Sequence, residues 1–354
     1  RESRQESPSI RSAGSLRLCS RAPMPRIPKV IATRGRAALG RAVVDALHAV
    51  PKLTRNMPHA RRRREGLTIW EDVDYVGTGL PAHRLDVFRL SDAPPEQRAL
   101  IYVHGGGFSA CSKDTHIGLA VAFARRGFTV FNINYRLAPR NPYPAACEDV
   151  AAALLYVRRR ASEYGASGEQ VTLAGESAGA NLITSTALAH GYELDLPWAQ
   201  DIRRDGPAIN AVLAGCGVYQ VSDMARFFRD GGQPPGRFVP GIAKAMELAY
   251  LGTVGLSAGE RVLADPVVLV ERLAPTQPLP PFFIFCGTGD LLLDDSVRLK
   301  AALDQRSVAA ELRTYEGEPH AFHALRSRPA AVACWKDHDR FLEQHLGQAG
   351  AAPR

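Results

Sequence analysis

Residues 171–181 constrain the fold of this chain more than any other stretch. They consist of a short apolar run, a turn and a series of small residues, a pattern that predicts a strand followed directly by a helix. The turn carries Gly175-Glu176-Ser177-Ala178-Gly179, a G-x-S-x-G sequence. A serine hydroxyl becomes a useful nucleophile only when it is held exposed beside a base. A sharp strand-to-helix turn holds it in this way, and glycines at 175 and 179 leave room for neighbouring backbone. Ser177 is therefore the candidate nucleophile, and an ordinary glycine turn is the alternative.

Length and composition allow a sizeable hydrophobic core. The 354 residues are 45% hydrophobic, which is enough for one large domain or two small ones. No apolar run approaches the ~20 residues of a membrane span, so we expect no stable membrane insertion. The six cysteines are scattered, without a C-x-x-C pair or a histidine at ligand spacing. We expect reduced core thiols in a cytoplasmic protein, without a zinc site.

The positive charge is concentrated near the N-terminus. The formal net charge is +8, and the densest basic cluster is residues 61–64, four consecutive arginines. Such a cluster attracts acidic surfaces, but no aromatic residues alternate with these arginines to stack on bases. We therefore interpret the cluster as a solvated helix face and expect no nucleic-acid partner.

Residues 1–66 differ from the rest of the chain. Residues 1–23 are polar, rich in Arg, Ser and Pro, and lack the apolar core of a secretory signal. We expect them to be disordered, or to precede the true start of the protein. Residues 24–66 show helical periodicity, with apolar residues on one face before Pro51, and are expected to form an N-terminal helical segment.

Strands and helices alternate through residues 67–348, which we take as the main domain. The predicted strands are 67–70, 84–90, 99–103, 129–134, 170–174, 208–214, 281–286 and 310–315, and the predicted helices after residue 100 include 117–126, 148–164, 294–307 and 330–345. This alternation predicts an α/β fold with a mostly parallel sheet covered by helices on both faces. Residues 218–277 interrupt the rhythm and are too long for a simple connection, so we expect a cap over the site.

Two further residues complete a catalytic set with the serine. Asp290 follows the seventh predicted strand and His320 follows the last, so both are expected at the same edge of the sheet as the serine turn. A base that accepts the serine proton and an acid that orients this base are what the chemistry needs. Among the competitors, His323 is expected to face solvent or the cap, while Asp294 and Asp295 suit capping of the helix that they open.

Backbone N–H groups are expected to bind the oxyanion of the tetrahedral intermediate. Three consecutive glycines follow the third predicted strand in residues 104–108 and allow close approach of the backbone to a substrate. We assign Gly106, Gly107 and Ala178 as the donors, and His104 as a structural brace of the loop. A flexible turn or a phosphate cradle is the alternative, but the G-K-[ST] sequence of a phosphate loop is missing.

The combination of these motifs resembles the hormone-sensitive-lipase-like family of α/β-hydrolases. The motifs occur in that family's order over about residues 70–345, and they are His104-Gly-Gly-Gly-Phe108, Tyr135-Arg-Leu-Ala-Pro139, Gly175-Glu-Ser-Ala-Gly179, Gly289-Asp290 and His320-Ala-Phe322. The resemblance implies an α/β-hydrolase fold with a helical cap, built from the N-terminal helical segment and the 218–277 insertion. It also implies that residues 135–139 brace the oxyanion loop.

Three positions depart from the family pattern. Arg140 stands where an acidic residue is usual, so a supporting ion pair is expected to be missing or reversed. The aspartate segment, residues 290–295, reads D-L-L-L-D-D in place of D-P-L-x-D-E, and Ala321 replaces a glycine. These departures affect loop geometry and substrate preference and remove no catalytic group.

The sequence therefore predicts a serine carboxylesterase for small to medium acyl esters, which acts through a Ser-His-Asp triad and an acyl-enzyme. The partner is a small-molecule ester, and no metal or cofactor is implied. An amide or lactone hydrolase with the same triad is the nearest alternative. A non-catalytic ligand-binding relative, like the plant gibberellin receptor, is less favoured because all three triad positions are filled. The sequence leaves a homo-oligomer open.

Overall fold

The computed structural model describes residues 64–228, 239–252, 255, 257 and 259–347. These residues belong to one compact unit that covers Val44–Arg354. The expected N-terminal segments, residues 1–23 and nearly all of 24–66, lie outside the described residues and stay predictions.

One sheet carries the fold. Its strands are β1 (Leu67–Asp74), β2 (Arg84–Leu90), β3 (Gln97–Val103), β4 (Phe128–Ile133), β5 (Ala166–Glu176), β6 (Ala208–Gly215), β7 (Phe282–Gly287) and β8 (Ala310–Tyr315). They are ordered β1-β2-β4-β3-β5-β6-β7-β8. The β1–β2 and β2–β4 pairs are antiparallel, and every other pair in the sheet is parallel. The predicted mostly parallel sheet is confirmed.

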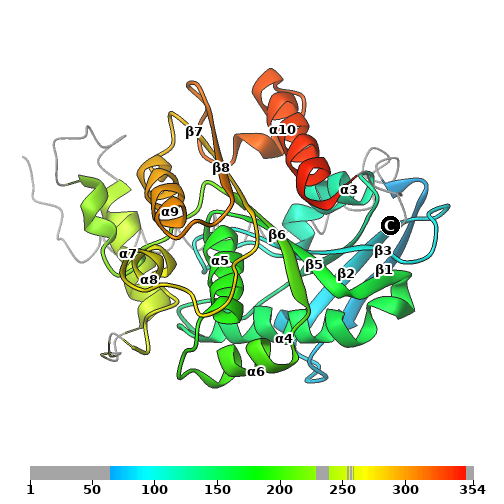
Figure 1. Ribbon diagram of the computed structural model, residues 1–354, viewed down its shortest axis with the longest axis horizontal. Coiled ribbons are helices and arrows are strands. Elements are labelled where there is room, and N and C mark those ends of the chain that lie inside the picture. Colours follow the sequence, from blue (N-terminus) through cyan, green and yellow to red (C-terminus); the bar gives the residue numbers. More distant parts are fainter. Residues whose placement is uncertain (1–63, 229–238, 253–254, 256, 258, 348–354) are drawn as a thin grey trace, which may run out of the picture. The chain divides into compact units, whose positions relative to one another are not determined.

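Helices cover both faces of the sheet. They are α3 (Ile117–Ala124), α4 (Ala145–Arg160), α5 (Ala178–Gly191), α6 (Pro197–Asp205), α7 (Val239–Leu251), α8 (Pro266–Arg272), α9 (Leu293–Gln305) and α10 (Pro329–Leu346). Figure 1 shows α3 and α10 on one side of the sheet and α4 and α6 on the other. Within the described residues, no helix combines the length and the apolar character needed to cross a membrane.

The central strand β3 shows why the strands are almost continuously apolar. Its residues Leu100 and Tyr102 pack in the layer of α3 and α10, whereas Ile101 and Val103 pack in the layer of α4 and α5. Side chains alternate between the two faces of a strand. Because helices cover both faces, both sets of side chains must be apolar.

Two parts of the chain differ from the sequence prediction. One is α6, a short helix with Trp198, Ala199 and Ile202 buried, which the sequence prediction did not include. The predicted helix 148–164 is α4, which begins at Ala145 and gives way to a 3-10 turn over Ala161–Tyr164. In the expected cap region, the described residues form a 3-10 turn (Met224–Phe228), α7 and α8.

The turn between β5 and α5 is packed against the end of β3. A Cβ atom at Gly179 would lie 2.1 Å from the Val103 carbonyl oxygen, and one at Gly175 would lie 2.7 Å from the same atom. Both distances are shorter than any real Cβ contact, and the obstructing atom is backbone that cannot rotate away. The expectation that positions 175 and 179 must be glycine for lack of space is supported by this geometry.

We expect Gly179→Ala to destabilise the protein by at least about 1–3 kcal/mol, because the added methyl group must push α5 away from β3. Urea unfolding followed by circular dichroism measures this free energy. Gly118→Ala is the matched control, since a Cβ atom at this glycine near the start of α3 meets nothing within 4 Å. The control is expected to leave stability unchanged or raise it by up to about 1 kcal/mol. Equal effects of the two substitutions would contradict the packing argument.

Candidate active site

Ser177 occupies the sharp turn between β5 and α5. Its backbone angles are φ 56° and ψ −121°, a strained conformation for a residue with a side chain. The strand ends at Glu176 and the helix begins at Ala178, so the serine stands alone between them. Its own N–H donates to the Gly215 carbonyl oxygen at the end of β6, over 2.8 Å. The hydroxyl is thus placed at the carboxyl edge of the sheet, as predicted.

The glycine loop that follows β3 lies directly beside this serine. A Cβ atom at Gly105 would lie 3.1 Å from the Cβ of Ser177. Gly106 and Gly107 both have positive φ angles, 113° and 58°. A side chain at Gly106 would also collide with the Ala110 carbonyl oxygen, at 2.2 Å. The loop can therefore approach the serine only as a glycine run, and Ala178 is buried at the adjacent start of α5.

Glu176, the residue before the serine, connects the turn to this loop. Its buried carboxylate accepts the backbone N–H of Gly105 over 2.6 Å and pairs with the His116 Nε2 over 2.7 Å. The Tyr102 hydroxyl donates to the other carboxylate oxygen. Burial alone raises the pKa of Glu176, but the charge of His116 and these hydrogen bonds lower it to about 2. The carboxylate is therefore ionised and fixes the start of the loop.

The expected brace behind the loop is also present. The Tyr135 hydroxyl donates to the His104 carbonyl oxygen over 3.0 Å, and the two rings stack with centroids 4.3 Å apart. The next residue, Arg136, pairs with Asp149 and Glu148 of α4. Arg140 is exposed. An ion pair therefore stands behind the loop, but it is formed by Arg136. Among the described residues no ion pair involves Arg140, in line with the expectation that the usual pair of this position is missing.

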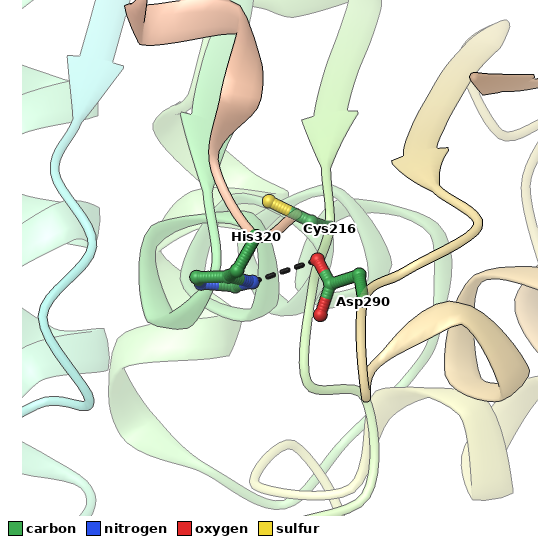
Figure 2. A group of neighbouring side chains, drawn as sticks. All are labelled: Cys216, Asp290 and His320. Carbon is green, nitrogen blue, oxygen red and sulfur yellow. Dashed lines mark hydrogen bonds and ion pairs between the residues drawn. The ribbon is translucent and has the colours of Figure 1, made fainter. Parts of the chain in front are cut away.

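His320 and Asp290 meet where β7 and β8 end. His320 Nδ1 lies 2.8 Å from Asp290 Oδ2 (Figure 2). The other carboxylate oxygen accepts the N–H of Leu292 over 3.0 Å. The two loops are joined by backbone, since the Gly289 N–H donates to the Glu318 carbonyl oxygen over 3.1 Å. The aspartate is buried, whereas 41% of the histidine side chain is exposed to solvent.

Cys216 lies against this pair and was not singled out by the sequence analysis. It follows β6 directly, and its sulfur points toward His320 (Figure 2). Burial alone lowers the pKa of His320, but the interaction with the neighbouring Cys216 and the hydrogen bond with Asp290 raise it above its ordinary value. The signal for Cys216 is that it follows Gly215, whose carbonyl oxygen accepts the Ser177 N–H. This signal depends on which strands are neighbours in the sheet, and strand order could not be derived from the sequence.

Two competing residues have roles other than those predicted. His323 is buried rather than facing solvent or the cap, because its ring packs on Phe285 with centroids 4.9 Å apart. Burial lowers the pKa of His323 to about 4. Asp295 is fully buried and does not cap its helix. Its carboxylate accepts the Tyr219 N–H and pairs with Arg226, so it ties α9 to the segment after β6.

Helix α7 lies over the glycine loop. The Tyr250 ring stacks on Phe108 with centroids 3.6 Å apart, and the Met246 sulfur is 3.1 Å from the position of a Cβ atom at Gly107. The insertion between β6 and β7 therefore supplies one wall above the loop. The two α7 side chains in contact with the loop, Met246 and Tyr250, are apolar and aromatic.

Comparisons with known proteins agree with this geometry. A protein-family model described as the alpha/beta hydrolase fold matches residues 100–324. Acetyl esterases of Salmonella paratyphi B and Salmonella typhi are 32% identical over 254 residues, which cover 71% of this chain and 74% of theirs. A bacterial heroin esterase superposes with a TM-score of 0.68 at 20% identity, over 89% of this chain and 91% of its own. Esterase B of Lactobacillus rhamnosis superposes with a TM-score of 0.66 at 19% identity, over 87% of this chain and 97% of its own.

The chain therefore belongs to the α/β-hydrolases, within the hormone-sensitive-lipase-like family that its motifs resemble. In that family it is a carboxylic ester hydrolase.

The ion pair between Glu176 and His116 makes stability depend on pH. Burial opposes a charged His116, but Glu176 raises the pKa of the histidine above 6.5. The stabilisation is complete below pH 6.5 and is lost as the pH rises through this raised pKa. On the acid side, it is present above pH 4.5 and is lost as the pH falls toward about 2.

We expect Glu176→Gln to lower the free energy of unfolding by about 3 kcal/mol between pH 4.5 and 6.5, where both partners are charged. The difference from the parent should narrow as the pH becomes alkaline. Unfolding titrations over this range measure it. His190→Gln is the control, because burial and Arg203 lower the pKa of His190. Its loss should leave the decrease in the free energy of unfolding at alkaline pH unchanged. A pH-independent difference for Glu176→Gln would contradict the ion-pair account.

Proposed function

We propose that the chain is a serine carboxylesterase in which Ser177 is the nucleophile, His320 the general base and Asp290 the residue that orients this base. The observation that supports this most strongly is the 2.8 Å contact between His320 Nδ1 and Asp290 Oδ2 at the sheet edge that also carries the serine turn. Because Asp290 engages Nδ1, the remaining nitrogen, Nε2, is the one left to accept the serine proton.

The reaction proceeds in two displacements. Ser177 Oγ attacks the ester carbonyl carbon while its proton passes to His320 Nε2, and the N–H groups of Gly106, Gly107 and Ala178 donate to the oxyanion. The imidazolium, stabilised by Asp290, then gives this proton to the departing alcohol as the C–O bond breaks. Water repeats the sequence on the acyl-enzyme, releasing the acid and restoring the serine.

An amide or lactone hydrolase with the same residues is the second candidate function. The chemistry of the three groups is identical for an ester, a lactone and an amide, and the acyl pocket decides between them. The names of the relatives, acetyl esterases, favour an ester with a short acyl chain.

The cysteines bear on where the protein is located. The five described cysteines, at positions 111, 147, 216, 286 and 334, are free thiols, which fits a reducing compartment such as the cytoplasm. Self-association stays a prediction of the sequence analysis, and sedimentation velocity of the full chain tests it.

We expect Ser177→Ala to reduce kcat by at least about 10⁴-fold, because the remaining loop donors cannot replace a nucleophile. Asp290→Asn should reduce it by about 10³–10⁴-fold, since the histidine loses the partner that selects its tautomer. Hydrolysis of p-nitrophenyl acetate measures both.

Asp294→Asn is the matched control for the acid. This aspartate lies four positions further on and is exposed at the start of α9, so its removal should change kcat by less than about twofold. Full activity in a folded Ser177→Ala variant, or equal losses in the two aspartate variants, would rule out the proposed assignment.

The apolar wall from α7 should set the acyl chain length. Met246 lies over Gly107, next to the position where the acyl carbonyl is expected. Met246→Ala removes this obstruction, so we expect the ratio of kcat/KM for hexanoate over acetate esters to rise by about 10-fold or more, the effect of one or two extra methylene contacts.

Leu248→Ala is the control for this substitution, because Leu248 is on the same helix but 52% exposed. A p-nitrophenyl ester series from acetate to palmitate gives the profile of each variant. An identical profile for the parent and Met246→Ala would exclude α7 as the wall of the acyl pocket.

A further inference from the structure

The thiol of Cys216 is unused by the proposed reaction, although it lies in the middle of the site. The residue is almost fully buried, and its N–H donates to the Phe285 carbonyl oxygen over 2.7 Å. This bond ties the residue to β7, the strand that precedes the Asp290 loop. The backbone angle φ is 36°, which turns the chain sharply after β6. The thiol position is therefore fixed by the sheet and does not depend on a mobile loop.

Cys216, Asp290 and His320 form a potential set of metal ligands. One ligand atom from each residue, a sulfur, a carboxylate oxygen and a ring nitrogen, lies within 4.8 Å of the other two (Figure 2). Zinc bound by such atoms at ~2.0–2.3 Å would require separations of about 3.4–3.6 Å between them in tetrahedral geometry. The three side chains would have to shift to reach these separations, because the atoms lie up to 4.8 Å apart and the Asp290 Oδ2 to His320 Nδ1 distance is 2.8 Å.

We propose that a thiophilic divalent cation of the zinc class binds to Cys216 Sγ, Asp290 Oδ2 and His320 Nδ1, and that its binding switches off the esterase. The inhibition rests on the proposed function, because it assumes that the Asp290–His320 pair is catalytic. The binding of the cation does not depend on the proposed function.

The ligand chemistry explains the loss of activity. The cation replaces the proton that His320 Nδ1 shares with Asp290, and this proton moves to Nε2. An imidazole with its proton on Nε2 cannot accept the proton of Ser177. Cys216 releases its thiol proton to solvent, so one proton is lost for each cation bound. No electron transfer or covalent change of the substrate is involved.

The donor set also predicts which cations bind. A thiolate with an imidazole and a carboxylate suits Zn²⁺ or Co²⁺, whereas Mg²⁺ and Ca²⁺ prefer oxygen ligands alone. Three protein ligands leave a fourth position for water. The exposed side of His320 provides the route of entry, because the other two ligands are buried.

Inhibition is tested with zinc chloride in a buffer free of chelators and thiols, using p-nitrophenyl acetate. We expect inhibition of the parent by Zn²⁺ and not by Mg²⁺, reversal by EDTA, and stronger inhibition at pH 8 than at pH 6 because a proton is released. Cys216→Ser should raise the half-inhibitory Zn²⁺ concentration by at least about tenfold. Cys216→Ala serves the same purpose if the serine variant does not fold.

Cys111→Ser is the matched control, since Cys111 is the free thiol with partial exposure among the described cysteines. Each variant is compared with its own rate without metal. Equal sensitivity of the parent and both Cys216 variants would overturn the proposal, as would relief of inhibition by Cys111→Ser alone.

Binding is measured separately from catalysis with Co²⁺ and the Ser177→Ala variant, which keeps all three ligands. We expect a near-ultraviolet charge-transfer band from thiolate to cobalt, absent after Cys216→Ser is added. If this band appears but the parent has no esterase activity, the metal site stands and the proposed function fails. If the parent is an esterase and the band is absent, the metal site is wrong.

Discussion

The contact between the first turn of α5 and the end of β3 determines how the site can be built. Two glycines allow backbone to meet backbone there, with the Val103 carbonyl oxygen filling the space where side chains would otherwise be. This close approach brings the serine turn and the loop after β3 together. The nucleophile and the proposed oxyanion donors are therefore positioned by two parallel neighbouring strands, whose register is regular from the Ala99–Val171 pair to the Val103–Gly175 pair beside the site.

Charge is used in the interior to hold this contact in one geometry. A carboxylate buried behind the serine would be costly if it were alone, but here a histidine, a tyrosine and a backbone N–H satisfy it. Since the N–H belongs to Gly105, the same carboxylate holds both the serine turn and the glycine loop. Fixing the loop in this way preorganises the N–H groups that follow Gly105, and preorganised donors stabilise the charge that develops in acyl transfer.

The sequence was sufficient to predict the sheet, the layers and the meeting of Asp290 with His320. Each of these depends on local signals, namely apolar runs, glycine turns and the rule that parallel strands end at one edge. His323 and Asp295 were misplaced because their surroundings come from residues distant in the chain. For His323 the decisive neighbour is Phe285, and for Asp295 it is Arg226. Cys216 was missed for the same reason, since the pairing of β6 with β7, and of β7 with β8, brings it to the loops of Asp290 and His320.

The pairing of Glu176 with His116 has a consequence for protein engineering. The second position of G-x-S-x-G is usually regarded as free to vary, yet in this chain its side chain, Glu176, pairs with a histidine sixty residues earlier in the sequence. A pentapeptide transplanted from this protein into another hydrolase would carry a buried negative charge without its counter-ion. Successful grafting of the serine turn would require the 3-10 turn Lys113–His116 as well, so the two segments form a single module.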